Sequence, residues 1–144
     1  MQTFISREQD YALRIVARLA ELAENVHMNM RQIATDMFIS LKFAAKIIHN
    51  LKIKGFIGTV QGKHGGVYLK QNPDNISVYD ILSSIGFKVR FNQCLCDDES
   101  CVLLTKCRFH SFFENEEKEL MNKFKQMKIS EFIFMREKNN KGGN

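Results

Sequence analysis

A seventeen-residue segment, 94–110, constrains this chain more than any other, because it contains every cysteine of the protein. The cysteines, and the histidine that ends the segment, are Cys94, Cys96, Cys101, Cys107 and His110. Thiolates are soft ligands that favour zinc, copper(I) or iron–sulfur clusters. Because the first residues lack the charged, apolar and small-residue pattern of a signal peptide, we expect a cytoplasmic protein. In a reducing compartment, clustered cysteines more often bind metals or undergo redox reactions than form structural disulfides.

The rest of the chain has the composition of an ordinary globular domain with one basic region. Its 144 residues are 44% hydrophobic, which is enough for a core, and no apolar run reaches the roughly 18 residues of a membrane span. Between residues 37 and 73 there are six lysines and two histidines but no Asp or Glu. A basic block in an otherwise balanced chain indicates a polyanion-binding face. The simpler alternative is a solvated, lysine-rich surface.

Apolar residues at helical spacing predict three helices in the first 54 residues, over 7–24, from 29, and over 41–54. Ser6 and Gln9 form a capping box before the first helix. Residues 25–29 are a polar break, Asn29 begins the second helix, and Ser40 caps the third. The second and third helices are short, are joined by a tight turn, and the third has a basic outer face. This is the pattern of a helix-turn-helix.

A glycine-rich hairpin follows these helices. Gly55 ends the third helix, and residues 56–60 and 67–69 are rich in strand-forming residues on either side of the turn 61–66. We therefore expect a mainly α (α+β) fold, a winged helix-turn-helix domain with a long C-terminal dimerisation helix. A nucleotide phosphate loop at 62–66 is a weaker alternative, because the Gly-Lys-Ser/Thr ending is missing and the loop joins two strands.

The second half of the chain contains one short and one long helical pattern. Ser77 caps a short helix that ends near Ile85, and a long helix is predicted over 108–127. The winged domain has too little chain to cover the apolar side of the long helix, so we expect it to pack against a second copy. Folding back on its own domain is the alternative. Ser130 is expected to cap a last apolar segment, 131–135. The resulting divisions are 1–86, 87–108, 109–137 and a flexible tail, 138–144.

Eight residues of the basic region are candidates for contact with double-stranded promoter DNA. They are Ser40, Lys42, Lys46, His49, Lys52, Gln61, Lys63 and His64. Ser40, Lys42 and Lys46 would face bases or phosphates. The remaining cations of the third helix and the wing, with Lys54, would mainly neutralise phosphates, which makes binding salt-dependent.

Several short motifs occur at the spacings of a known family. They are Asp10-Tyr11-Ala12-Leu13-Arg14, Gln32-Ile33-Ala34, Ile39-Ser40, Lys46-Ile47, Leu51 with Gly55, Gly62-Lys63-x-Gly65-Gly66 and Cys96-x4-Cys101-x5-Cys107. In these motifs the chain resembles the IscR/NsrR-type winged-helix transcription regulators, over nearly its whole length. Members with three such cysteines hold a 2Fe–2S or 4Fe–4S cluster, bind palindromic promoters as homodimers, and respond to nitric oxide, iron–sulfur supply or oxidants. The resemblance implies a homodimeric repressor of this kind, with a 2Fe–2S cluster favoured.

The resemblance implies three thiolate ligands and leaves the fourth ligand open. The cysteine gaps look like the NsrR branch, with Cys96, Cys101 and Cys107 as ligands. His110 has the offset of the histidine ligand in the IscR branch, and Asp10 has the position where some NsrR-type proteins supply a carboxylate from the partner subunit. Cys94 could replace Cys96. The family usually has Arg where this chain has Gln61, and the IscR branch can have Glu where it has Ala45, so the operator cannot be transferred from either branch.

Three other functions are compatible with parts of the sequence. A structural zinc site of three cysteines and one histidine is possible, although zinc knuckles usually have shorter gaps. A cluster-free thiol switch would use the same cysteines, and a small iron–sulfur electron-transfer protein would not need the basic region. No nucleophile–base pair or carboxylate pair supports catalysis, so we expect no enzyme activity.

Overall fold

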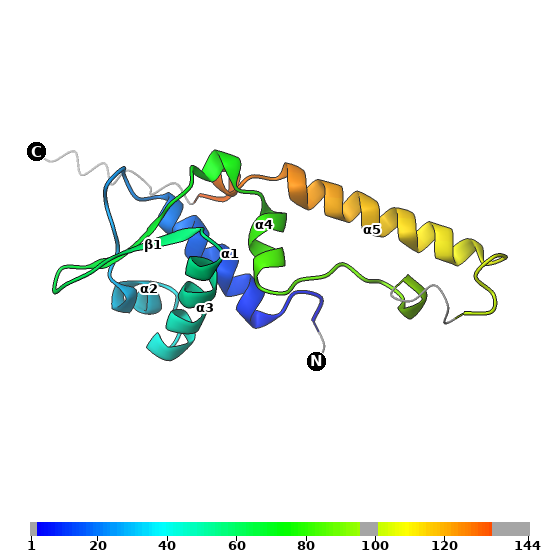
Figure 1. The fold of residues 1–144 in the computed structure, drawn as a ribbon, viewed down its shortest axis with the longest axis horizontal. Helices are drawn as coiled ribbons and strands as arrows, with labels where there is room; N and C mark the ends of the chain where they lie inside the picture. Colours follow the sequence, from blue (N-terminus) through cyan, green and yellow to red (C-terminus); the bar gives the residue numbers. More distant parts are fainter. Residues whose placement is uncertain (1–2, 96–100, 134–144) are drawn as a thin grey trace, which may run out of the picture.

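The computed structural model describes residues 3–95 and 101–133, which are mostly helical with one two-stranded antiparallel sheet (Figure 1). The elements are α1 (Arg7–Ala20), α2 (Met30–Asp36), α3 (Leu41–Ile53), β1 (Ile57–Val60), β2 (Gly66–Leu69), η1 (Pro73–Asn75), α4 (Val78–Ser84), η2 (Gln93–Leu95), α5 (Arg108–Gln126) and η3 (Ile129–Phe132). The predicted winged helix-turn-helix with a long C-terminal helix is confirmed. None of the helices in this part of the chain is long and apolar enough to cross a bilayer.

Local hydrogen bonds begin the helices where the sequence predicts them. At α1 the Ser6 hydroxyl accepts from the Gln9 amide (3.2 Å) and the Gln9 side chain accepts from the Ser6 amide (2.9 Å), which completes the capping box. The corresponding box also forms at α4. Asn29 caps α2 without a complete capping box, because the Gln32 side chain donates to Asp36 (2.7 Å) within the helix. Caps need only neighbouring residues, and so they are readable from sequence.

Helix α1 ends at Ala20, four residues before the predicted end at Glu24. The chain then turns, with Asn25 at φ +64°, and brings Met28 beside the wing. The Met28 amide donates to the Val67 carbonyl (2.9 Å) and the Val67 amide donates to the Met28 carbonyl (2.8 Å). The predicted polar break therefore supplies a buried side chain and an isolated bridge to β2.

The main core is enclosed by α1, α3, α4 and the wing, and it also includes η3 from the far end of the chain. Ile129 of η3 is fully buried there, and its amide donates to the Ile76 carbonyl (2.9 Å). These contacts set the start of the helical turn at Ile129, after the N-cap Lys128. The prediction that Ser130 caps this segment is therefore wrong, because Ser130 lies inside the turn.

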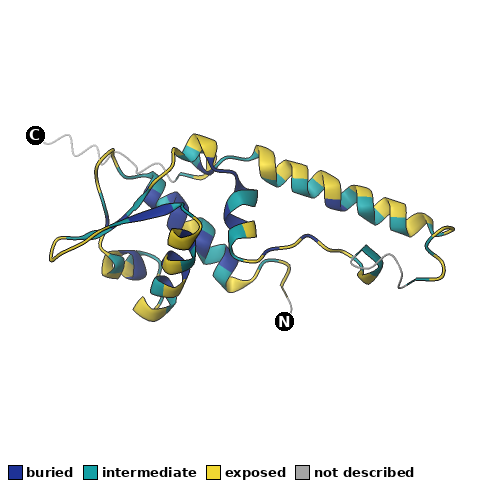
Figure 2. Ribbon diagram, in the orientation of Figure 1, coloured by how far each residue is buried: buried dark blue, intermediate teal, exposed yellow. Residues whose placement is uncertain are grey.

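Exposed and partly buried residues alternate along α5 (Figure 2), and its large apolar side chains are covered to different extents towards its two ends. At its C-terminal end Leu120 and Phe124 pack, with Met127, against a second cluster formed by α4 and residues 87–89. Towards its N-terminal end Phe109 is 72% exposed and Phe112 is 54% exposed. The fold-back alternative therefore describes the C-terminal half of the helix. The N-terminal half, here called the open half, leaves Phe109 and Phe112 largely exposed, whereas Phe113 is partly buried.

Candidate nucleic-acid interface and metal centre

The outer face of α3 presents the predicted basic residues. Ser40 caps the helix, since its hydroxyl accepts from the Phe43 amide (3.1 Å). One side of α3 is buried against α1 and the wing through Ala44, Ile47, Ile48 and Leu51. The predicted contact residues of the opposite side are all exposed, namely Lys42, Lys46, His49 and Lys52. The helix therefore has the amphipathic arrangement that a recognition helix needs.

The wing is held in register by a close approach of two strands. In the antiparallel pair of β1 and β2, Gly58 lies opposite Tyr68. The Tyr68 ring covers Gly58, and any side chain at that position would collide with it. The strands differ from the predicted ranges by one residue at their starts. Phe56 lies between α3 and β1, where its amide closes the end of the helix by donating to the Leu51 carbonyl (3.0 Å).

The predicted wing-tip residues Gln61, Lys63 and His64 are all exposed. Their turn contains Gly62 at φ +107°, a conformation that favours glycine. The His27 ring nitrogen Nε2 lies 2.6 Å from the His64 carbonyl oxygen and ties the turn to the segment after α1. The wing tip is therefore an exposed basic loop on a supported hairpin.

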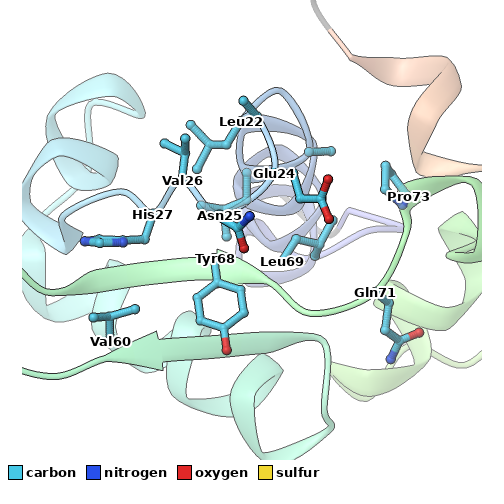
Figure 3. A pocket seen from close by; sticks show the side chains of 13 residues that line it. Leu22, Glu24, Asn25, Val26, His27, Val60, Tyr68, Leu69, Gln71 and Pro73 are labelled. Atoms are coloured by element: carbon cyan, nitrogen blue, oxygen red, sulfur yellow. The ribbon is translucent and has the colours of Figure 1, made fainter.

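The segment after α1 and the wing also enclose a hollow of about 450 Å³ (Figure 3). Leu22, Val26 and Leu69 are among its apolar lining residues, and Glu24 and Gln71 are among the polar ones. None of the residues that we predict for DNA or metal binding lines it.

The first turn of α1 adds two charged residues, Arg7 and Glu8, to the basic face of α3. Neither residue is among those predicted from the sequence. The Arg7 guanidinium lies over the rings of Phe43 (5.1 Å) and Tyr11 (5.5 Å), a cation–π arrangement at the start of α3. Glu8 accepts from the Lys46 ammonium at 2.7 Å. No local signal could reveal the contacts of Arg7 with Phe43 and of Glu8 with Lys46, because they join residues on two helices far apart in sequence.

The cysteine loop lies at the other end of the molecule. The wing turn and the loop are at opposite ends of its long axis, and α5 joins the loop to the winged domain (Figure 1). Cys94 is in η2, Cys101 follows in the loop, and Cys107 is the N-cap of α5. These three are partly exposed and form no disulfide. Cys96 lies outside the described residues, and within the described ones no three metal-ligating side chains form a group.

His110 has an unpaired atom that fits a role as a ligand. Its Nδ1 is buried and, within the described part of the chain, has no hydrogen-bond partner. Leaving a buried polar atom unpaired costs about 1–3 kcal/mol, and an ion is one of the ordinary explanations for such an atom. His110 is in the first turn of α5, three residues after Cys107. Thiolates and imidazoles are both donors that hold iron–sulfur clusters, although within the described residues they do not lie together as one group.

Asp10 does not share this environment. On α1 it forms an ion pair with Arg14 (3.0 Å), and both side chains are exposed. Helix α1 lies in the winged domain, away from the loop (Figure 1). Within one chain Asp10 is not beside the cysteines, so as a ligand it would have to come from a second copy.

Residues 87–92, here called the strap, lead from the winged domain to the cysteine loop (residues 94–110) and are held against α5. The Phe91 amide donates to the carboxylate of Glu117 (2.7 Å), which is buried in the middle of α5. The Phe91 ring also stacks on Phe4 (6.2 Å between centroids) and contacts Phe113 (6.1 Å). Phe4 precedes the cap of α1, so the strap connects the cysteine loop with the start of α1.

Comparisons with known proteins give a consistent result. The Rrf2 family model, described as "Iron-dependent Transcriptional regulator", matches residues 5–134. An HTH-type transcriptional regulator of Aquifex aeolicus is 30% identical over 130 residues, covering 89% of this chain and 90% of that protein. The regulator NsrR of Geobacillus kaustophilus is 30% identical over 100 residues, covering 69% and 68%. The structure of T. potens IscR has a TM-score of 0.68 at 21% identity, covering 89% of this chain and 84% of that one.

Proposed function

Because the chain belongs to the Rrf2 family of transcriptional regulators, we propose that it is a homodimeric repressor whose promoter binding responds to an iron–sulfur cluster. The family and the winged-helix fold support DNA-binding regulation. The observation that carries the sensing part is the buried, unpaired Nδ1 of His110 beside the cysteine loop. The signal would be nitric oxide, redox state or iron–sulfur supply.

In DNA binding, α3 would occupy the major groove and the wing would lie against the neighbouring backbone. The exposed side of α3 offers Ser40 and Lys42 near its N-terminal end, the part of a recognition helix that usually meets base edges. Lys63 and His64 at the wing tip suit phosphates or a narrow minor groove. Gln61 is uncharged and would contribute less to the minor-groove potential than an arginine. We expect affinity to fall as salt rises, because lysine–phosphate contacts release counterions.

A second copy of the chain would cover two apolar surfaces. One is a groove of about 530 Å³ between α1, α4 and the end of α5, lined by Leu13, Phe124 and Phe132 among others. The other is the open half of α5 with Phe109 and Phe112. Apolar side chains that are left uncovered together suit association with another surface. A symmetric dimer would also place two recognition helices on the two halves of a palindrome.

The cluster ligands that we propose are Cys101, Cys107 and His110, with Cys96 or Cys94 completing the set. When bound, the cluster would supply an iron with a non-thiolate ligand, and such a ligand shifts the reduction potential of the cluster. The protein positions the ligands. His110 is held on the first turn of α5, and the hydrogen bond from Phe91 to Glu117 holds the strap, which leads into the cysteine loop, against α5. Without the cluster, the cysteine loop would be free to move, and the support that the strap and α5 give to the winged domain would change.

The test is to purify the protein without oxygen and measure iron, sulfide, absorption and Mössbauer spectra before and after nitric oxide. Binding to a promoter fragment is followed on the same samples. We expect a coloured protein with near-stoichiometric iron and sulfide, and DNA affinity that changes with nitric oxide. A colourless protein with one zinc per chain would remove the sensing part and leave DNA binding to be judged separately. Promoter binding that survives Lys42→Glu with Lys46→Glu would contradict the proposed DNA-binding face.

A further inference from the structure

The basic face of α3 contains one carboxylate, and it comes from another helix. Glu8 lies on the first turn of α1, where its two oxygens have different partners on α3. Oε2 accepts from the Lys46 ammonium (2.7 Å) and Oε1 accepts from the Asn50 amide (3.2 Å). Lys46 and Asn50 are one helical turn apart. Since the sequence has no Asp or Glu between residues 37 and 73, the packing of α1 on α3 brings this negative charge into an otherwise acid-free region.

The pair is exposed on its lysine side and partly covered on its carboxylate side. The Lys46 side chain is 62% exposed and the Glu8 side chain is 23% exposed. The anion is therefore held in place by the fold, while the ammonium group faces outward. An ammonium has three N–H donors. One is directed to Glu8, and two remain for a ligand.

This arrangement affects phosphates and bases differently. Sequence-independent binding comes from lysines that neutralise phosphates. A phosphate near Lys46 meets an ammonium whose charge is already balanced by Glu8, and it is repelled by that carboxylate. A guanine edge is uncharged and offers the O6 and N7 acceptors to a lysine, so it can still accept the two free N–H groups.

We infer that Glu8 is a specificity-determining residue, which stops Lys46 from acting as a phosphate contact and leaves it as a hydrogen-bond donor to bases. The inference rests on the proposed DNA-binding function and adds a residue to it. Non-specific affinity is kept low, while the operator retains its contact with Lys46. The ratio of specific to non-specific binding is therefore larger than the number of lysines would suggest.

The experiment compares Glu8→Gln with wild type on two duplexes over a range of salt concentrations. One duplex is selected by the wild-type protein from a random-sequence pool, and the other is its scrambled version. For the scrambled duplex we expect the slope of log K against log salt to become more negative by about 0.9, the value for one added phosphate contact. Between roughly 50 and 200 mM salt, this adds about a 3.5-fold loss of affinity. The ratio of specific to non-specific affinity at low salt should fall.

Two further variants distinguish this effect from a general change in charge. Glu114→Gln removes the same charge from an exposed pair with Lys118 on α5 and should leave the slope at the wild-type value. Adding Lys46→Ala to Glu8→Gln should return the slope to the wild-type value, because the released contact is lost.

The inference is overturned if Glu8→Gln leaves the slope unchanged, if Glu114→Gln changes it equally, or if the change persists without Lys46. Thermal unfolding of each variant shows that the fold is intact. If the wild-type protein selects no duplex at all, the proposed DNA-binding function itself fails, and the inference fails with it.

Discussion

Phe38, in the turn between α2 and α3, is a residue poorly suited to its backbone conformation. Its φ is +55° and its side chain is 93% exposed. A left-handed conformation costs a residue with a Cβ atom about 1–2 kcal/mol, and glycine avoids this cost. With so little of the ring buried, packing does not offset the strain. Nothing in the fold explains a phenylalanine at this position.

Comparing Phe38→Gly with Phe38→Ala should separate backbone strain from side-chain packing. Both variants remove the ring, but only glycine relieves the strain at φ +55°. We expect the glycine variant to be more stable than the alanine variant by up to about 1 kcal/mol, the strain being partly cancelled by the greater freedom of glycine in the unfolded chain. Urea unfolding of both proteins measures the difference. A glycine variant that is less stable than the alanine variant by about 0.5–1 kcal/mol, the cost of glycine's freedom in the unfolded chain, would show that the turn is unstrained.

Helix α5 is an example of an element whose polar and apolar residues have roles that periodicity alone does not predict. By spacing, Glu117 falls on the apolar side of the helix, four residues after Phe113 and three before Leu120, and it is the buried residue of the helix. It accepts the hydrogen bond from Phe91, and the Arg90 guanidinium lies 3.7 Å away. The carboxylate therefore fastens the strap to the helix and supports the route between the cysteine loop and the winged domain.

Removing this carboxylate should loosen the strap before it affects the rest of the fold. Glu117→Ala leaves the Phe91 amide without its acceptor, and we expect a loss of about 1–3 kcal/mol. Glu117→Gln keeps a carbonyl acceptor and should lose less. Hydrogen exchange at the Phe91 amide, measured together with denaturant unfolding, should be fastest in the alanine variant. As a control, Glu114→Ala breaks only an exposed pair and should cost less than about 0.5 kcal/mol. Equal exchange rates of the Phe91 amide in wild type and in Glu117→Ala would show that Glu117 does not hold the strap.

The whole molecule is elongated, with a DNA-binding module at one end and the cysteine loop at the other (Figure 1). Helix α5 spans the distance (Figure 1), and its open half has the exposed side chains of Phe109 and Phe112. In the proposed dimer, changes in the loop would reach the DNA-binding module through α5 and the strap. The same surface would set the spacing of the two recognition helices.

If the open half of α5 is part of a dimer interface, Phe109→Ser with Phe112→Ser should shift the protein towards monomer. Because both rings are largely exposed in one chain, the helical content and the fold of the winged domain should be retained. Sedimentation equilibrium measures the change in dissociation constant, and circular dichroism checks the fold. Val26→Ser, an exposed apolar position outside this surface, is the control. An unchanged dimer would place the interface elsewhere.

Features of this protein that depend on a few neighbouring residues could be predicted from the sequence. The caps at Ser6, Ser40 and Ser77 form as expected, because their hydrogen bonds join residues three positions apart. The glycine-rich wing turn and the exposed basic side of α3 also follow from local conformation and helical period. For the metal centre, the segment and the candidate ligands could be identified, but the choice among ligands stays a prediction.

Other features depend on which faces meet when the chain folds. Glu8 reaches Lys46 across 38 positions, Ile129 returns to the core beside α1, and the apolar stripe of α5 is half covered and half open. No local pattern contains this information, because long-range contacts arise from the packing of whole elements. The cysteine loop could therefore be recognised from the sequence, while its distance from the DNA-binding face, and the strap that links them, required the folded structure.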